Sequence, residues 1–167
     1  ALGEDNDGNL WVGSENGGLT IFNFQENTFK RYAQDELDNT SLTNNSIHSI
    51  YKDAKGNMWV GTFSGGVCYL NSDANKFAHF KHTSGNSLSN NKVLCIYEDS
   101  DSNIWVGTDG GGLNMYNPKS GDFTVYKHQE GNPNSICGNY VLNVREDSEG
   151  NLWIGTWGDG VTVYNRK

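Results

Sequence analysis

Three groups of residues have types and spacings that could do chemistry. The segment GTFSGG at residues 61–66 follows a short apolar run, as glycine-rich loops that cradle phosphate groups follow a strand. Aspartates pair as Asp-x-Asp in the segments DNDGN and DSDSN, the spacing with which calcium-binding loops begin. Histidines and cysteines, which can ligate zinc, are scattered along the chain. The elements that position these residues decide which chemistry is available.

The phosphate and calcium hypotheses each require a particular structural context. A phosphate-binding glycine loop is confirmed by a helix that begins directly behind it. A calcium loop needs about twelve residues with a distal bidentate glutamate. Here a strand is expected directly after each aspartate segment, and Lys55 stands where a ligand would be needed. Hairpin turns are the better interpretation of the aspartate pairs.

Histidines and cysteines show no metal-ligand spacing. His79 and His82 are three apart on an expected strand, so they point to opposite faces. Cys68 and Cys95 lie in strand-like runs and are expected to be small buried side chains. No Gly-x-Ser-x-Gly nucleophile elbow is present, and the carboxylates fall mostly in turns. We therefore expect no metal, no cofactor and no catalytic site. The other members of these groups are His48, His128 and Cys137, and surface or strand-end positions are expected for the histidines.

The composition indicates one domain of short strands joined by tight turns. The chain has 167 residues, 21 of them glycine, and no segment shows an apolar i, i+3, i+4 stripe. Glycine tolerates the positive φ angles of such turns. A formal net charge of −8 argues against nucleic acid as a partner, because phosphates need a Lys/Arg footprint. No apolar run approaches the roughly 18 residues of a membrane helix, so this segment is not expected to contact a membrane.

An internal repeat explains the glycines. Trp11, Trp59, Trp105 and Trp153 are separated by 48, 46 and 48 residues. Around them stand the segments DNDGNLWVGSENGGL, DAKGNMWVGTFSGGV, DSDSNIWVGTDGGGL and DSEGNLWIGTWGDGV. Four copies of one unit cannot all be nucleotide sites, so we expect the glycines to be structural turn residues. The first glycines of the four copies are Gly13, Gly61, Gly107 and Gly155.

Each unit of 46 to 48 residues is predicted to contain four strands, which we name a, b, c and d in chain order. In the second unit they are residues 47–52, the tryptophan run, residues 67–70 and residues 77–80. Four antiparallel strands at this period are typical of a β-propeller blade, whereas a β-sandwich requires no fixed period. The tryptophans are expected to pack between neighbouring blades.

We therefore predict an all-β fold, a β-propeller segment of four-stranded antiparallel blades, two of them complete and two incomplete. The repeats divide a single segment at residues about 1–40, 41–86, 87–134 and 135–167. The first unit is expected to keep only strands b, c and d, and the last to lack strand d. This interpretation makes the chain an excerpt of a longer propeller. Its exposed end blades favour self-association.

The repeat resembles the two-component regulator propeller repeat. Copy four follows the pattern best, from VRED at residues 144–147 through GNLWIGT at 150–156 to YN at 164–165. The chain departs from the family pattern at three positions. Ser14 replaces threonine in copy one, Ser102 replaces glycine in copy three, and Asp159 replaces a glycine in copy four. The resemblance implies a periplasmic sensor region of a membrane-anchored hybrid two-component system, with a histidine kinase outside this segment. It also implies oligosaccharides from complex glycans as ligands.

One position of the repeat, which holds a different residue in each copy, gives the candidate ligand site. It lies directly after Gly-Ser/Thr in the b–c turns, which share one face of a propeller with the d–a loops. Sugar rings stack well on aromatic side chains, and an exposed turn has no folding need for such groups. In the alternative interpretation, Phe63 and Trp157 only pack on adjacent loops. The candidate residues in the turns, and before strand a on the same face, are Glu15, Phe63, Lys92, Asp109, Tyr140 and Trp157.

These features predict a non-enzymatic propeller segment that senses an oligosaccharide or another small ligand. A scaffold for protein interactions is the first alternative, and sugar-induced thermal stabilisation separates the two. A propeller lyase is the second alternative, because some propellers with similar tryptophan-containing repeats are lyases. Turnover of a polysaccharide would support that alternative.

Overall fold

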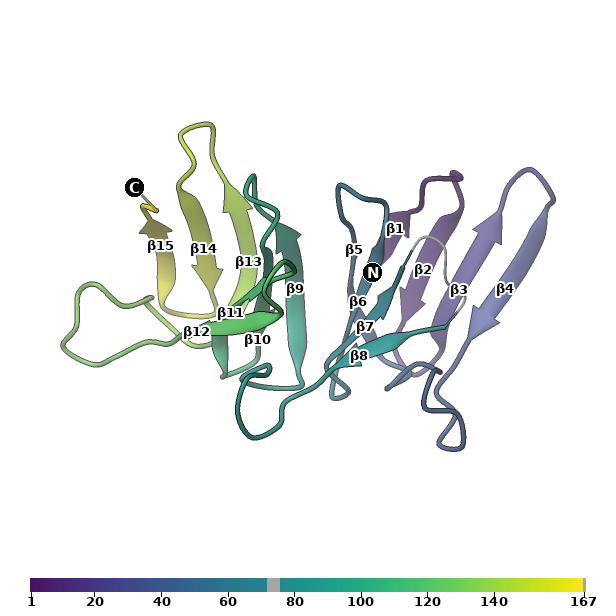
Figure 1. The fold of residues 1–167 in the computed structure, drawn as a ribbon, viewed down its shortest axis with the longest axis horizontal. Helices are drawn as coiled ribbons and strands as arrows, with labels where there is room; N and C mark the ends of the chain where they lie inside the picture. Colours follow the sequence, from purple (N-terminus) through teal and green to yellow (C-terminus); the bar gives the residue numbers. More distant parts are fainter. Residues whose placement is uncertain (72–75, 167) are drawn as a thin grey trace.

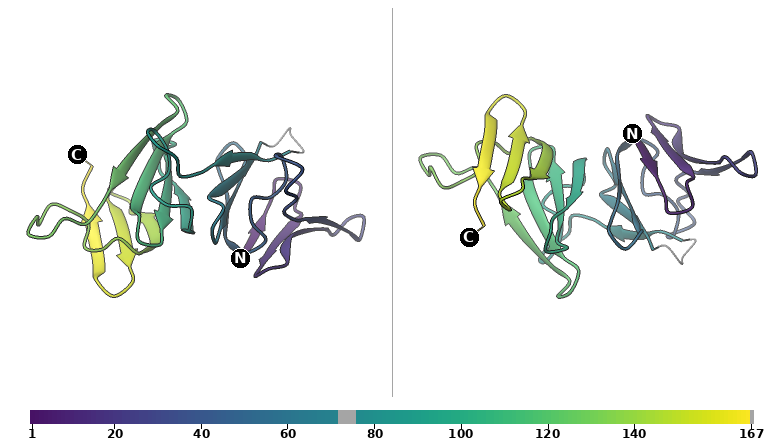
Figure 2. Two further views of the ribbon diagram at one scale, coloured as in Figure 1. Left: turned by 90° about the horizontal axis from the view of Figure 1, so that it is seen from below. Right: turned by 90° about the horizontal axis from the view of Figure 1, so that it is seen from above.

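The computed structural model describes residues 1–71 and 76–166, which contain fifteen β-strands and no helix. The strands form four antiparallel sheets of consecutive strands, which stand side by side in chain order (Figure 1). Figure 2 shows the same row of sheets from below and from above. No helix long and apolar enough to cross a membrane occurs in these residues. Each sheet is one blade, so the predicted all-β propeller segment is confirmed.

The strand bounds follow the predicted order a, b, c, d. Blade 1 contains β1 (Leu2–Glu4), β2 (Leu10–Ser14), β3 (Gly18–Asn23) and β4 (Thr28–Tyr32). Blade 2 contains β5 (Ile47–Lys52), β6 (Met58–Thr62), β7 (Val67–Leu70) and β8 (Ala78–Phe80). Blade 3 contains β9 (Val93–Glu98), β10 (Ile104–Thr108), β11 (Gly112–Asn117) and β12 (Asp122–Tyr126). Blade 4 contains β13 (Val141–Glu146), β14 (Leu152–Thr156) and β15 (Gly160–Tyr164).

Blade 1 corrects the predicted count of complete blades. Its strand a was expected to be missing, but β1 pairs with β2 over three residues, with Gly3 opposite Trp11. The terminal ammonium of Ala1 also donates to the carbonyl of Gly13 at 2.9 Å, which extends the pairing. Three blades are therefore complete, and blade 4 has three strands among the described residues. The link from β7 to β8 includes residues 72–75, which lie outside the described part.

Strand a of blades 2, 3 and 4 contains a β-bulge that was not predicted. In blade 2, Ile47 lies opposite Thr62 and Ser49 lies opposite Gly61, so His48 is the extra residue. The same shift occurs at Leu94 and Leu142. A bulge re-aims the side chains around it. The result is that apolar residues three apart, such as Ile47 and Ile50, face the same neighbouring blade.

The first glycines of the four repeats are strand residues rather than the predicted turn residues. Gly61 lies in β6, and a Cβ atom there would approach the Val93 side chain of the next blade to 2.5 Å. A Cβ atom at Gly107 would likewise lie 2.7 Å from the carbonyl oxygen of Val141 in the next blade. Glycine is needed at these positions because strand a of the next blade packs directly on them. The glycines with positive φ at the b–c turns come later in each repeat, and they are Gly18, Gly66, Gly110, Gly112, Gly158 and Gly160.

Each tryptophan of strand b packs against the following blade where one is present. Trp59 shares a core cluster with Ile104 and Val106 of blade 3, and Trp105 shares one with Leu152 and Ile154 of blade 4. A third cluster places Trp11 against blade 2. The exposed fractions of Trp11, Trp59, Trp105 and Trp153 are 3%, 4%, 1% and 49%. The difference follows from position, because Trp153 has no following blade in this chain.

The cysteines in strand-like runs are buried, as predicted. Cys68 and Cys95 both lie in the clusters between blades. Burial raises the pKa of the Cys95 thiol to about 12, and burial also raises the pKa of Cys68. Both thiols therefore remain protonated and serve as small apolar side chains.

The aspartate that opens each a–b turn binds the tryptophan of the same blade. In blade 2, Asp53 Oδ1 accepts the backbone N–H of Lys55 at 3.0 Å, which is the Asx-turn the sequence predicts. Its Oδ2 accepts Trp59 Nε1–H at 2.9 Å and Asn57 Nδ2–H at 2.9 Å. The tryptophan bond recurs in the other blades at 2.9, 2.7 and 2.8 Å. This network fixes both the turn and the indole ring.

We expect the free energy of unfolding to fall between about pH 4 and pH 2 because of two of these aspartates, Asp5 and Asp147. Hydrogen bonds from Trp153 and Asn151 lower the pKa of Asp147 to about 2. Partial burial raises the pKa of Asp5, but hydrogen bonds from Trp11 and Asn9 outweigh this effect and lower it. An aspartate of the unfolded chain titrates near about 3.9.

The lowered pKa values mean that the folded state binds these protons less readily than the unfolded state. Their stabilisation is therefore complete above about pH 4 and is lost as the pH falls toward about 2. Urea denaturation at pH 6, 4 and 3 measures the effect. Asp147→Asn should reduce the slope in this window, and an unchanged slope in that variant would contradict the assignment.

The outer faces of the two end blades are apolar and exposed. On blade 1, the rings of Phe22 and Phe29 pack in a tilted arrangement with centroids 4.6 Å apart, and Phe29 is 71% exposed. On blade 4, Trp153 lies opposite Val163, and both side chains are half-exposed. Between the blades inside the chain, a tryptophan-bearing face packs on an apolar face of the next blade. The two end faces have the same complementary character.

We propose that two copies of the chain associate through these end faces, the Trp153 face of one copy against the Phe22 and Phe29 face of the other. Size exclusion with light scattering should show a mass near twice 18.5 kDa at high micromolar concentration. Trp153→Glu should shift this mass toward the monomer, because it places a charge in the interface. A wild-type chain that stays monomeric would contradict the proposal.

Candidate ligand-binding face

The b–c turns and d–a loops of the blades lie along one edge of the molecule, the lower edge in Figure 1. Within a blade, the turn is bonded to the residue before strand a: Phe63 N–H donates to the Ser46 carbonyl at 2.9 Å, and Asp109 N–H donates to Lys92 at 3.0 Å. Between blades, Gly66 N–H donates to the Asn91 carbonyl at 2.9 Å. These bonds place successive turns side by side, as the sequence predicts.

Four side chains form a contact series at this edge, centred on blades 2 and 3. The ammonium group of Lys92 lies 5.2 Å from the Phe63 ring centroid and 3.7 Å from Asp109 Oδ2. On the other side of Phe63, the His48 ring centroid is 5.4 Å away. Phe63 and the side chain of Lys92 are both nearly half exposed, at 44% and 46%. An exposed pair of this kind contributes about 1 kcal/mol or less to stability.

Tyr140 and Trp157 continue this edge onto blade 4. Trp157 N–H donates to the Tyr140 carbonyl at 2.9 Å. The Tyr140 ring lies over Gly110 of blade 3, at 3.6 Å from the position of a Cβ atom there. Tyr140 is 49% exposed and Trp157 is 72% exposed. The Trp157 indole therefore offers most of its surface to solvent.

The structure joins most of the predicted site residues and adds one. Lys92 contacts both Phe63 and Asp109. Tyr140 and Trp157 are joined by a backbone hydrogen bond. Glu15 is exposed at the same edge on blade 1, outside this contact series. His48 was predicted only as a surface or strand-end residue. Its signal in the sequence is the spacing of three between apolar residues of strand a, which indicates a bulge.

The chemical character of this edge is aromatic and mixed in charge, without a metal-binding arrangement among the described residues. No group of three or more His, Cys, Asp or Glu side chains there could hold a metal ion. The rings supply apolar faces for C–H groups. Lys92 donates hydrogen bonds and Asp109 accepts them, as the hydroxyl groups of a polar ligand require.

The fold defines the chain as a segment of antiparallel β-propeller. Residues 1–16, 41–64, 87–110 and 135–158, more than half of the chain, match the family model described as two component regulator propeller. The chain therefore belongs to the two-component regulator propeller family. A comparison with curated protein sequences gives no match.

Solved structures share the propeller fold. The WD40 β-propeller domain of Doa1 has a TM-score of 0.68 at 10% identity, over 96% of this chain and 48% of that chain. A protein of unknown function from Bacteroides thetaiotaomicron has a TM-score of 0.64 at 19% identity, over 96% and 45%. The extracellular domain of a protein described as a one component system, from B. thetaiotaomicron, has a TM-score of 0.52 at 20% identity, over 99% and 27%. The chain thus spans less than half the length of each.

Proposed function

We propose that this chain is the ligand-sensing part of an extracytoplasmic, periplasmic sensor, and that it recognises an oligosaccharide with its exposed turn edge. The observation that carries the proposal is the series of exposed side chains Phe63, Lys92, Tyr140 and Trp157 on neighbouring blades. Membership of the two-component regulator propeller family supports a role in signalling to a histidine kinase outside this segment. The low coverage of solved neighbours supports the hypothesis that the segment is one part of a longer propeller.

An oligosaccharide fits the geometry of this edge. Phe63, Tyr140 and Trp157 offer ring faces for stacking on sugar C–H groups. The Lys92 and Asp109 pair lies between the rings in chain order and can exchange hydrogen bonds with hydroxyl groups. Because the residues come from three blades, a ligand that binds all of them favours one arrangement of these blades over others. A shift in blade or subunit arrangement is then the signal, with the ligand binding one state more tightly than the other.

Trp157→Ala and Phe63→Ala should each weaken oligosaccharide binding about 5- to 10-fold without changing the melting temperature. Each ring contributes on the order of 1 kcal/mol beyond its buried area, and the area term adds to this. Isothermal titration calorimetry of the intact sensor, with a ligand taken from a glycan panel, measures the loss.

Phe24→Ala is the matched control, because Phe24 is 62% exposed but lies at the end of strand c, away from the b–c turns. Its affinity should equal that of the wild type. Equal affinity in the Trp157→Ala and Phe63→Ala variants as well would exclude these positions as the sugar site.

A non-catalytic interaction scaffold is the second candidate function. The exposed apolar faces of the end blades favour it, because such patches are typical of protein interaction sites. A thermal-shift screen separates the two functions. Stabilisation by a glycan supports sensing, whereas no stabilisation by any glycan favours the scaffold.

A further inference from the structure

A cavity of about 490 Å³ lies between blades 2 and 3, on the side of the a–b turns. These turns form the upper edge in Figure 1, opposite the b–c turns of the candidate ligand-binding face. Blades 2 and 3 each have four strands, so the walls of the cavity belong to two complete blades. The polar and rim residues of the cavity include Asp53, Lys55, Glu98, Ser102, Pro118 and Lys119.

An arginine side chain occupies the equivalent place between blades 3 and 4. The guanidinium group of Arg166 donates to Asp99 Oδ2 at 2.7 Å and to Glu146 Oε1. Its Nε–H donates to the Gly150 carbonyl at 3.0 Å. The Arg166 side chain is 17% exposed and the Asp99 side chain is fully covered. The acceptors belong to two neighbouring blades, so this guanidinium joins one blade to the next.

The repeat places the same three acceptors one blade earlier. The counterparts are Asp53 for Asp99, Glu98 for Glu146, and Ser102 for Gly150. All three counterparts line the cavity between blades 2 and 3. Ser102 has a φ of 65° and Gly150 has a φ of 85°. Both are left-handed conformations, so the two turns have the same backbone form and can present the same carbonyl.

A proline stands where the arginine would be. Pro118 is the counterpart of Arg166, because each directly follows a Tyr-Asn pair at the end of strand c. Proline has no group that can donate a hydrogen bond. The ion pairs among the described residues are those of Lys92 and Arg166, so neither Asp53 nor Glu98 has a cationic partner there.

The Asp53 carboxylate can accept a guanidinium without giving up its own turn. Asp99 accepts Trp105 Nε1–H at 2.7 Å and still binds Arg166. Asp53 accepts Trp59 Nε1–H at 2.9 Å in the same way. The bond to the indole therefore leaves room for a cation on this carboxylate.

The Glu98 carboxylate has an oxygen that its counterpart shares with a serine. Glu98 Oε2 accepts the Ala54 N–H at 2.6 Å, as Glu146 Oε2 accepts the Ser100 N–H at 2.7 Å. Glu146 Oε1 also accepts the Ser100 hydroxyl at 2.7 Å. Ala54 has no hydroxyl group, so Oε1 of Glu98 is available to a ligand.

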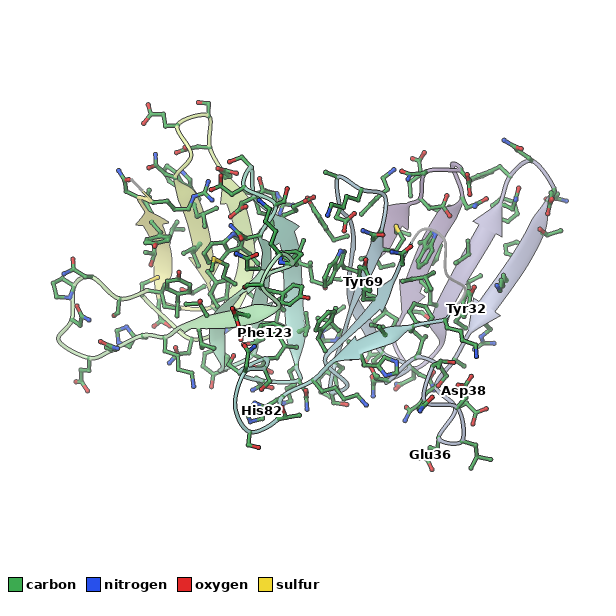
Figure 3. The ribbon with its side chains drawn as sticks, viewed as in Figure 1. Tyr32, Glu36, Asp38, Tyr69, His82 and Phe123 are labelled. Carbon is green, nitrogen blue, oxygen red and sulfur yellow. The ribbon has the colours of Figure 1, made fainter. Side chains whose placement is uncertain are left out.

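Three aromatic rings form an apolar wall of the cavity. The Phe80 ring centroid lies 6.2 Å from that of Tyr69 and 4.9 Å from that of Tyr116. All three rings line the cavity and are partly exposed. Figure 3 labels Tyr69, which lies where blade 2 faces blade 3. Guanidinium planes stack well on such rings.

The two lysines of the rim select against a bare cation. Lys55 and Lys119 are both exposed and line the cavity. Lys55 takes the position of Asp101, which forms an ion pair with Arg166 at 3.2 Å. A positive charge thus replaces a negative one beside the place of the guanidinium. A ligand that also carries a carboxylate turns this repulsion into attraction.

We infer that this cavity binds a guanidino acid, a small molecule with a guanidinium group at one end and a carboxylate at the other, the class to which arginine belongs. The guanidinium forms charge-assisted hydrogen bonds with Asp53 and Glu98. Its carboxylate lies at the rim with Lys55 and Lys119. The bound ligand joins blade 2 to blade 3, as Arg166 joins blade 3 to blade 4.

Isothermal titration calorimetry of the full chain with 4-guanidinobutyrate at low ionic strength tests this inference. Saturable binding is expected. The neutral analogue 4-ureidobutyrate should bind about tenfold more weakly or worse, because it loses the charge on the hydrogen-bonded group. Agmatine, which has an ammonium group in place of the carboxylate, should bind about fivefold more weakly. Absence of saturable binding, or equal binding of the three compounds, would overturn the inference.

Glu98→Gln should weaken 4-guanidinobutyrate binding about fivefold or more, because the amide keeps the shape and the bond to Ala54 but removes the charge. Glu4→Gln is the matched control. Glu4 has the same repeat position on blade 1, is exposed and lies outside this cavity, so its removal should leave the affinity unchanged. An equal loss in both variants would show a general charge effect and overturn the site.

Pro118→Arg supplies the guanidinium from the chain itself and should abolish binding of 4-guanidinobutyrate. It should also raise the melting temperature measured by circular dichroism, because the new side chain can join blades 2 and 3 as Arg166 joins blades 3 and 4. Pro118→Gln is the control, since it removes the proline without adding a charge and should keep the ligand affinity. Undiminished binding in the folded Pro118→Arg variant would overturn the inference.

Discussion

Trp105→Ala should lower the free energy of unfolding by about 3–5 kcal/mol, as large-to-small changes of buried aromatic residues do. The Trp105 ring is 1% exposed, packs against Tyr126 at a centroid distance of 5.5 Å, and lies in the cluster shared with blade 4. Its removal leaves a cavity between two blades that are already close-packed. Urea denaturation followed by circular dichroism measures the loss. Trp59→Ala should give a loss of the same size, since Trp59 is also buried.

Trp153→Ala is the matched control, because it changes the same repeat position in the one blade without a following neighbour. Half of the Trp153 side chain is already exposed, so we expect a loss of about 1 kcal/mol or less, as for surface changes. The measurement is made at a concentration at which light scattering shows a monomer. Equal losses at Trp105 and Trp153 would show that the indole stabilises its own blade and not the contact between blades.

Asp53→Ala should lower the free energy of unfolding by about 3 kcal/mol. Asp53 is 8% exposed, and its carboxylate accepts hydrogen bonds from the backbone of Lys55 and Asn57, from the Asn57 amide and from Trp59. Alanine leaves these donors without an acceptor in a buried turn, and bonds to a charged group contribute about 1.5–3 kcal/mol each. Asp53 is a cleaner choice than Asp99, which also binds Arg166 at 2.7 Å.

The control for this prediction is Asp7→Ala, which changes an exposed aspartate in the equivalent turn of blade 1 and should change stability by less than about 0.5 kcal/mol. A double-mutant cycle with Trp59→Phe tests the bond itself, because phenylalanine keeps a ring and removes the N–H donor. We expect a coupling energy of about 1–2 kcal/mol between Asp53 and Trp59. Additive losses would show that the two residues act independently.

The sequence by itself determined the blade as the repeating unit and every strand except β1, which was expected to be missing. Each predicted strand follows from a local apolar run bounded by turn residues, and the period of the tryptophans places those runs in register. The Asx-turn at Asp53 was predictable for the same reason, since its acceptor and donor are two residues apart. The b–c turns with Phe63 and Trp157 at one edge also follow from strand order, because alternate turns of an antiparallel sheet lie at the same edge.

The tertiary structure alone decided which copies of a repeated residue have different environments. Trp105 and Trp153 occupy the same position in nearly identical segments, yet one is buried and the other is half exposed, because burial depends on the adjacent blade. Gly61 lies in a strand and not in a turn for a similar reason: Val93 of the next blade leaves no room for a Cβ atom. These contacts join residues far apart in sequence, so no local pattern encodes them.

The candidate site and the cavity beside Tyr126 depend on such long-range contacts as well. The proximity of His48 to Phe63 depends on a bulge in strand a that pairing with β6 creates. The cavity beside Tyr126 is lined by the loop before blade 4, by the outer strand of blade 3 and by β15, which come from separate parts of the sequence. The sequence predicts each of these elements separately. Only the packing of one blade on the next brings them together, because that packing is a property of pairs of blades and not of a single repeat.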